Sequence, residues 1–229
     1  MTDKGTLKWK LAQALEYRWW QRYLKKKDTS EYLTWKKQYW VTLLQSFLSD
    51  TTALKTINDK TVLDAGCGPA GIFLSLQGNT VDAMDPLLDK YKSLPHFIPE
   101  QYPWVSFINS TIEALHEAAK YDLIFCMNAI NHVSDIELCY DNLFKALKPG
   151  GYLIISTDAH RYTFLKKIFQ LLPGDVLHPI QLDIEDYNKH LTQRGFKIIK
   201  DTLYQQEAIF NYHITLARKQ AKFISKSSN

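Results

Sequence analysis

Cysteine is scarce in this chain, and long apolar runs are missing. The three cysteines among 229 residues, Cys67, Cys126 and Cys139, are odd in number and show no C-x-x-C spacing. This pattern excludes a disulfide framework and argues against a zinc site, so we predict reduced thiols and no metal. No segment approaches the roughly 20 apolar residues of a membrane span, and the polar start from Met1 to Lys4 does not resemble a signal peptide. We therefore expect a cytoplasmic protein.

Basic residues and tryptophan are concentrated in the first 40 residues. The whole chain carries a formal charge of +4, whereas residues 1–40 hold ten basic and four acidic residues, a net charge of +6. Apolar residues recur there at steps of three and four, which predicts one amphipathic helix over residues 5–27 and a second that begins at Asp28. Five of the six tryptophans lie in this segment: Trp9, Trp19, Trp20, Trp35 and Trp40. We interpret residues 1–50 as an N-terminal helical lid, although aromatic stripes that only pack the helices onto the domain would look the same.

Glycine is also sparse, with nine residues in all, yet three of them fall within residues 66–71. Val62 and Leu63 before this stretch predict a short buried strand, and residues 72–76 after it predict a helix. Glycine lacks a side chain, so backbone N–H groups at the start of the helix can approach a ligand closely. The spacing predicts a nucleotide-type ligand, while a tight corner without a ligand is the alternative.

Two aspartates favour the ligand. Asp64 lies two residues before the first glycine, at the carboxyl end of the predicted strand, where open α/β sheets bind ligands. Asp85 follows a second short run, residues 79–84, at about the separation at which a carboxylate meets the ribose hydroxyls of an adenosine. The two acids and the glycine turn together predict an adenosine-containing ligand.

Four segments in order carry a resemblance to a known family. Asp64-x-Gly66-x-Gly68, Asp85, the stretch 121–128 and the stretch 147–155 resemble the first motif, the ribose-binding acid, the fourth strand with its exit loop, and the following turn and strand of the class I S-adenosylmethionine-dependent methyltransferases. The resemblance implies a doubly wound α/β fold, with a seven-stranded, mostly parallel, Rossmann-like sheet, a C-terminal antiparallel hairpin and an N-terminal helical cover. It also implies S-adenosyl-L-methionine as the cofactor.

The resemblance further implies which residues form the site. No carboxylate stands at 110–112, just after the third strand, where the family often contacts adenine, so that contact is left open. His132 first and His178 second are candidates for a general base because both lie on loops that the family fold directs toward the active face; a bracing role for His132 is the alternative. The predicted cofactor contacts are Asp64, Gly66, Gly68, Gly71, Asp85, Pro86, Thr111, Ile112 and Asn128.

The second half of the chain completes the predicted domain, residues 51–218, before a polar tail over 219–229. A capping box, Ser134 with Glu137, predicts a helix start, and Asp183 predicts the start of another helix that ends at Gly195. A further helix is expected around residues 161–172. Residues 196–204 and 210–217 read as a final antiparallel pair. A nicotinamide-dependent oxidoreductase would continue with parallel strands, so this hairpin favours the methyltransferase.

We interpret the chain as an enzyme that methylates a small molecule with an aromatic or apolar body, because the predicted lid is rich in Trp and Tyr. One alternative is an RNA methyltransferase whose basic aromatic helices grip phosphates and stack bases. Another is a module that binds S-adenosylmethionine without transferring its methyl group. A lysine-rich helix face is usually only solvated, so we do not expect a nucleic-acid partner. The sequence leaves the acceptor atom and the oligomeric state open.

Overall fold

The computed structural model describes residues 7–48, 57–160, 182–206 and 210–221. Their centre is one seven-stranded sheet with the strand order β3-β2-β1-β4-β5-β7-β6. The strands are β1 (Thr61–Ala65), β2 (Thr80–Met84), β3 (Val105–Ile108), β4 (Tyr121–Cys126), β5 (Leu147–His160), β6 (Phe196–Gln206) and β7 (Phe210–Lys219).

Strands β1 to β5 pair in parallel, and the chain reverses only at the end of the sheet. There β7 pairs antiparallel with both β5 and β6. Strand β1 pairs with β2 on one side and with β4 on the other, so the strand order reverses its direction at β1. In such sheets ligands bind beyond the carboxyl ends of the strands at this switch point. The predicted fold class, with its C-terminal hairpin, is confirmed.

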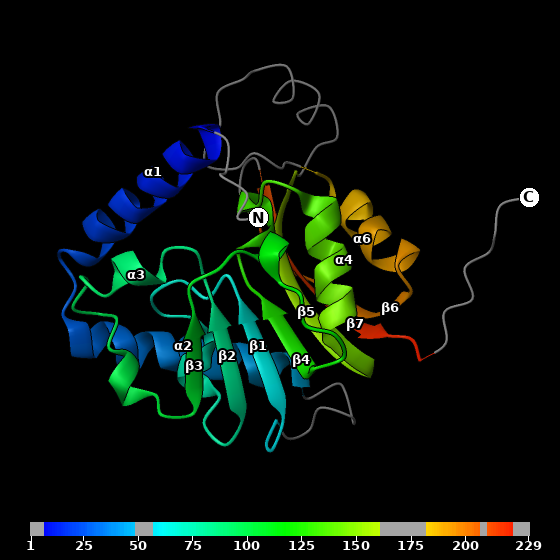
Figure 1. The fold of residues 1–229 in the computed structure, drawn as a ribbon, viewed down its shortest axis with the longest axis horizontal. Helices are drawn as coiled ribbons and strands as arrows, with labels where there is room; N and C mark the ends of the chain where they lie inside the picture. Colours follow the sequence, from blue (N-terminus) through cyan, green and yellow to red (C-terminus); the bar gives the residue numbers. More distant parts are fainter. Residues whose placement is uncertain (1–6, 49–56, 161–181, 207–209, 222–229) are drawn as a thin grey trace, which may run out of the picture.

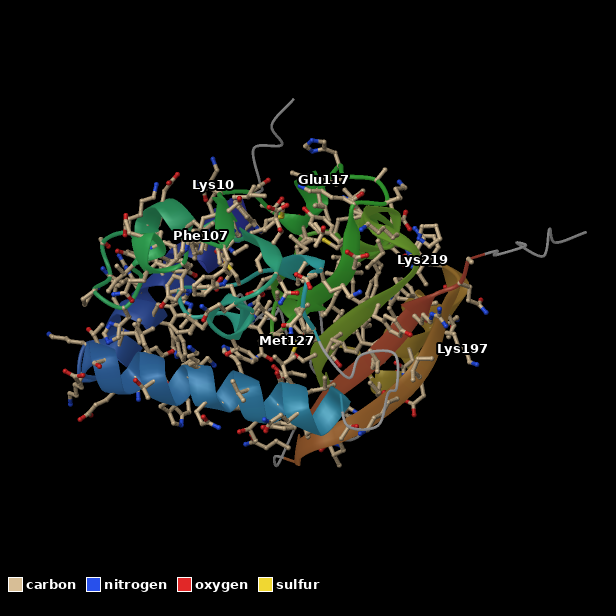
Figure 2. The ribbon with its side chains drawn as sticks, turned by 90° about the horizontal axis from the view of Figure 1, so that it is seen from below. Lys10, Phe107, Glu117, Met127, Lys197 and Lys219 are labelled. Atoms are coloured by element: carbon tan, nitrogen blue, oxygen red, sulfur yellow. The ribbon has the colours of Figure 1, made fainter. Side chains whose placement is uncertain are left out.

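Helices cover both faces of the sheet, and each face has its own buried cluster (Figure 1). Helix α2 (Thr29–Leu48) lies along one face, with Tyr32, Trp40 and Leu43 buried in the first cluster. Seen from below, α2 runs lengthwise under the strands (Figure 2). Helices α4 (Ile136–Ala146) and α6 (Ile184–Gln193) cover the other face. Their apolar stripes fill the second cluster, so the sheet is buried on both sides.

Helix α1 (Leu7–Leu24) lies away from the sheet faces, beside the short helix α3 (Leu88–Tyr91) (Figure 1). The Tyr17 hydroxyl lies 2.6 Å from Ser93 Oγ, just beyond α3. Between α1 and α2 the backbone N–H of Glu31 donates to Asp28 Oδ1 at 3.0 Å, which caps α2 as the sequence predicted. Among the described residues, no helix is long and apolar enough to cross a membrane.

Two local predictions were wrong in detail. The glycine turn leads into a short 3₁₀ helix, Ile72–Ser75, rather than a longer α-helix. At α4 the cap is Asp135, whose side chain accepts from Leu138 N, and not Ser134. Glu113 Oε1 accepts from the backbone N–H of Ser134 at 2.7 Å, the group that Glu137 would accept from in the predicted capping box. The predicted cap of α6 at Asp183 is confirmed. The helix expected around 161–172 lies outside the described residues.

Candidate functional site

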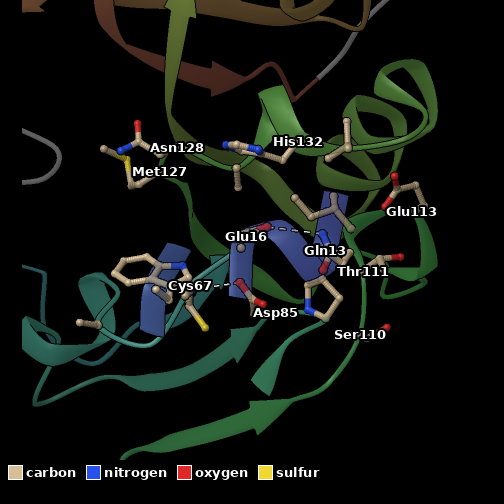
Figure 3. A pocket seen from close by; sticks show the side chains of 18 of the residues that line it. Gln13, Glu16, Cys67, Asp85, Ser110, Thr111, Glu113, Met127, Asn128 and His132 are labelled. Atoms are coloured by element: carbon tan, nitrogen blue, oxygen red, sulfur yellow. Dashed lines mark hydrogen bonds between the residues drawn. The ribbon is translucent and has the colours of Figure 1, made fainter. Parts of the chain in front are cut away.

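A cavity lies at the carboxyl ends of β1, β2 and β4, between the sheet and helix α1 (Figure 3). It occupies the switch point of the strand order, so segments far apart in the sequence meet there. Among the predicted site residues, the following line it: Gly66, Gly68, Asp85, Pro86, Thr111, Ile112, Asn128 and His132. Asp64 and Gly71 do not line it, and His178 lies outside the described residues.

The glycine turn forms one wall of the cavity. Gly66 and Gly68 have φ of 73° and 58°, a backbone conformation that favours glycine. A Cβ at Gly66 would lie 2.2 Å from the Cβ of Ala129, so no other residue fits there without movement of the β4 exit loop. At Gly68 the nearest neighbour of an added Cβ would be the ring of Trp20, at 3.5 Å. The turn is therefore packed on one side by the exit loop and faced on another by α1.

Asp64 and Gly71 lie beneath this turn. The Asp64 carboxyl is 1 % exposed, and its Oδ2 accepts from the backbone N–H of Phe73 at 3.1 Å. A Cβ at Gly71 would lie 2.4 Å from that same oxygen. Burial raises the pKa of Asp64 to about 7, against the backbone hydrogen bonds that lower it. In this geometry Asp64 fixes the shape of the turn from below; the predicted cofactor contacts of Asp64 and Gly71 stay predictions.

Asp85 links the end of β2 to the glycine turn. Its Oδ2 accepts from Gly68 N at 3.0 Å, and its Oδ1 accepts from Leu87 N at 2.8 Å. Burial raises the pKa of Asp85 to about 6, while these two backbone hydrogen bonds lower it. Each carboxylate oxygen keeps a further lone pair toward the cavity, so the pair can accept from two adjacent hydroxyls.

The exit loop of β4 is held by a polar network. Asn128 has a positive φ of 55°. Its backbone N–H donates to Ser156 Oγ at 2.8 Å, and the Ser156 hydroxyl donates to Asn128 Oδ1 at 3.1 Å. Tyr212 in β7 donates to the same Ser156 oxygen at 2.9 Å. The antiparallel hairpin thus fixes the Asn128 side chain at the edge of the cavity, with one lone pair of its Oδ1 left for a ligand.

The first helix was interpreted as part of a lid, with no cofactor contact assigned to it; in the structure Gln13, Glu16 and Trp20 of α1 line the cavity. These three are spaced at steps of three and four, so they share one face of α1. Glu16 is the one acid in α1, and burial together with the nearby charge of Asp85 raises its pKa to about 7. A lone acid in a basic helix was a signal that could have been read from the sequence.

Helix α2 contributes two side chains that the sequence reasoning also missed, Lys36 and Trp40. Trp40 Nε1 donates to the carbonyl of Ala70 at 3.0 Å, which ties α2 to the glycine turn. The Lys36 ammonium lies 4.5 Å from the centre of the Trp40 ring. Burial lowers the pKa of Lys36 to about 8, against the attraction of Asp64 that raises it. The Lys36 ammonium therefore lies beside the glycine turn in a poorly hydrated environment.

A second cavity adjoins the first and shares five residues with it. The shared residues are Glu16, Trp20, Lys36, Asn128 and His132. The second cavity is completed by Trp19, Tyr23, Tyr32 and Asp158. Aromatic rings thus dominate one side, and ionisable groups stand at the junction between the two spaces.

These residues fit S-adenosylmethionine. Gly68 has no side chain to cover the backbone of the turn. Asp85 offers two acceptor oxygens for a diol. Pro86 and Ile112 form an apolar surface for a flat base. Asn128 Oδ1 can accept from an ammonium group. Among the described residues, no cluster of three or more His, Cys, Asp or Glu could hold a metal ion.

Comparison with solved structures supports the fold. A 1,6-didemethyltoxoflavin-N1-methyltransferase from Burkholderia thailandensis, solved with 1,6-didemethyltoxoflavin and S-adenosylhomocysteine, is similar with a TM-score of 0.64. The match covers 96% of this chain and 93% of that chain at 16% sequence identity. At this identity the likeness concerns the fold alone.

Two curated relatives come from Rickettsia, and both are named "Ubiquinone biosynthesis O-methyltransferase". The protein of Rickettsia akari (strain Hartford) is 36% identical over 189 residues, which cover 72% of this chain and 74% of that protein. The protein of Rickettsia bellii (strain OSU 85-389) is 37% identical over 103 residues. That match spans less than half of either protein, 44% of this chain and 43% of the relative.

A sequence family described as "Methyltransferase domain" matches residues 32–201, most of the chain from early α2 to β6. The match includes the glycine turn, Asp85 and the β4 exit loop. The predicted fold is confirmed, and S-adenosyl-L-methionine as the predicted cofactor follows the family match. This chain therefore belongs to the methyltransferase-domain family, as a class I S-adenosylmethionine-dependent methyltransferase.

Proposed function

We propose that this protein transfers the methyl group of S-adenosylmethionine to an oxygen of a small molecule with an aromatic or apolar body. The observation that carries the proposal is the second cavity, which opens beside the cofactor cavity and is walled by Trp19, Trp20, Tyr23 and Tyr32. Rings of this kind stack on a flat acceptor and exclude water from it. The name of the Rickettsia relatives supports oxygen as the acceptor atom.

The first cavity holds the cofactor in this proposal. Asp85 accepts from the ribose hydroxyls, the turn at Gly66 and Gly68 lies along the amino-acid part, and Asn128 accepts from its ammonium group. Pro86, Thr111 and Ile112 surround the base. When bound, the cofactor supplies an electrophilic methyl group on a sulfonium, whose thioether is already a good leaving group.

The chain's own residues then have to orient the acceptor and accept its proton. His132 lines both cavities, so its imidazole can take a proton from an acceptor hydroxyl that faces the first cavity. Lys36 stands at the same junction, where a positive charge favours the ionised form of that hydroxyl. Orientation and exclusion of water supply the rest. His178 stays a second candidate for the base.

The N-terminal helices form the cover of this site in the proposal. Residues 1–50 act as a helical lid, 51–218 as the cofactor-binding domain and 219–229 as a polar tail. Glu16 and Trp20 of α1 line both cavities, so one helix closes over cofactor and acceptor together. An RNA chain would need an open, basic groove instead, and the aromatic rings here line a cavity.

A radiolabelled-methyl assay tests the proposal. Purified protein is incubated with labelled S-adenosylmethionine and either a panel of small phenols and other hydroxylated aromatic compounds or total RNA. We expect label in a small hydroxylated product and none in RNA, and we expect Asp85→Ala to abolish most of the transfer. Label that enters RNA at physiological salt would contradict the proposed substrate class. S-adenosylhomocysteine binding without transfer to any fraction would favour a non-catalytic module.

A further inference from the structure

Gln13 in helix α1 is a buried polar side chain with an unused acceptor. The residue is 7 % exposed, although most residues of its helix are half-buried or exposed. Among the described residues, its Oε1 has no hydrogen-bond partner. A buried acceptor without a partner costs about 1–3 kcal/mol, so such an atom usually marks a place where a ligand or water completes the site.

The orientation of this amide is fixed by its neighbour. Gln13 Nε2 donates to Glu16 Oε2 at 3.5 Å, one helical step away. The NH₂ group therefore faces Glu16, and Oε1 faces the other way. Figure 3 shows Gln13 in the cavity with Thr111 and Asp85 near it, and all three residues line the same space. The unused acceptor therefore belongs to a cavity that Asp85 and the segment after β3 also line.

The walls of this cavity include surfaces suited to a flat base. Pro86 and Ile112 are apolar, and Ile112 is 4 % exposed. Glu113 also lines the cavity, but it is only half-buried, and its Oε1 accepts from the Ser134 backbone at 2.7 Å and from the Ser134 hydroxyl at 2.9 Å. The oxygen of Gln13 is buried and has no partner among the described residues, so it gains most from a donor on the base.

We propose that Gln13 binds the adenine of the cofactor, its Oε1 accepting a hydrogen bond from the exocyclic 6-amine. The assignment rests on the proposed function only in that the cavity holds S-adenosylmethionine. The 6-amine is the one N–H donor on the base of adenosine, so it is the group that an orphaned oxygen selects. The helix that covers the acceptor thereby also recognises the cofactor, and cofactor binding stabilises α1 in this position.

The test compares two ligands by calorimetry on the full-length protein. One is S-adenosylhomocysteine, and the other is its 6-deamino analogue, in which hydrogen replaces the exocyclic amine. We expect the wild type to bind S-adenosylhomocysteine about ten-fold more tightly or better, because the analogue leaves Oε1 unpaired. Gln13→Met keeps the length of the side chain but removes the acceptor, so it should bind both ligands with nearly equal affinity.

Gln38→Met is the matched control, since Gln38 is exposed on α2, donates to Thr42 in its own helix and does not line the cavity. It should keep the wild-type preference. Gln13→Leu repeats the measurement should Gln13→Met not fold. A wild type that binds both ligands equally, or a Gln13 variant that keeps the preference, overturns the assignment alone. A wild type that binds neither ligand overturns the proposed function with it.

Discussion

Helices α1 and α2 have similar compositions but different positions and tasks. Both are rich in Trp, Tyr and Lys. Helix α2 buries Trp40, Leu43 and Leu44 against the sheet, and the carbonyl of Lys37 accepts from the Ser75 hydroxyl at 3.1 Å. Helix α1 leaves Leu11 half exposed and places polar side chains in the cavity instead.

The two helices of the proposed lid thus differ in what they contact. The family match begins at residue 32, so it includes most of α2 and none of α1. Helix α2 packs on the sheet, and α1 lines the cavity. Aromatic content alone does not distinguish these roles, because a ring that packs a core and a ring that walls a cavity look identical in a sequence.

The largest expected effect tests α2 as part of the core. Leu43 is 1 % exposed, so Leu43→Ala should lower the free energy of unfolding by about 2–5 kcal/mol. The matched change in α1, Leu11→Ala, removes a side chain that is 51% exposed and should cost no more than about 0.5 kcal/mol. Urea titration measures both. Equal losses in the two helices would erase the distinction between them.

Substitutions in the β4 exit loop and in helix α1 should change different kinetic parameters. His132 belongs to the β4 exit loop, and His132→Gln should lower kcat by about a hundred-fold while S-adenosylhomocysteine affinity changes little. Trp19 walls only the second cavity, so Trp19→Ala should mainly raise KM for the acceptor. Steady-state kinetics and calorimetry separate the two. Near-full turnover of His132→Gln would show that positioning suffices without a base from this loop.

Asp85, which follows β2, tests how much the sheet side of the cavity contributes to cofactor binding. Asp85→Ala should weaken S-adenosylhomocysteine binding by roughly ten- to a hundred-fold, because a charged hydrogen-bond partner is lost. It should also loosen the turn, since Gly68 N and Leu87 N lose their acceptor. Asp85→Asn retains an oxygen acceptor and should lose less affinity. Calorimetry that finds unchanged affinity for Asp85→Ala would remove this residue from the ribose site.

The smallest expected effect is the pH dependence of stability that Glu16 in helix α1 causes. The pKa of Glu16 is raised to about 7, so between its ordinary value near 4.5 and about 7 the folded state holds a proton that the unfolded state releases. The free energy of unfolding therefore falls as pH rises through this window. Glu16→Gln removes the penalty and should be more stable than the wild type by about 1–3 kcal/mol at pH 8, and equally stable at pH 4. Identical pH profiles in denaturant titrations would contradict the burial of Glu16.

Much of the fold followed from local patterns. The glycine turn, Asp85 and the final hairpin were predicted because strand periodicity, turn residues and spacing are properties of short segments. The contribution of α1 was not predictable in the same way. Gln13 and Glu16 reach the cavity only through the packing of α1 beside α3, and nothing in residues 7–24 alone specifies that position.

Local patterns were also insufficient where two candidates competed. Ser134 and Asp135 can both cap a helix; Asp135 caps α4, and Glu113, twenty-one residues before Ser134, accepts from the Ser134 backbone N–H that a capping box would pair with Glu137. Asp64 has a structural role that its spacing did not reveal, because its carboxylate accepts from Phe73 N; its predicted cofactor contact stays a prediction.

Amide hydrogen exchange with and without S-adenosylhomocysteine tests most directly the claim that α1 completes the cofactor cavity. At a concentration a hundred times the dissociation constant, the ligand can add up to about 2.7 kcal/mol of protection to any segment that must open for its release. We expect a large gain in protection over residues 7–24, centred on Gln13 to Trp20, and a small gain over residues 29–48. Unchanged exchange in α1, with protection confined to the glycine turn and Asp85, would contradict it.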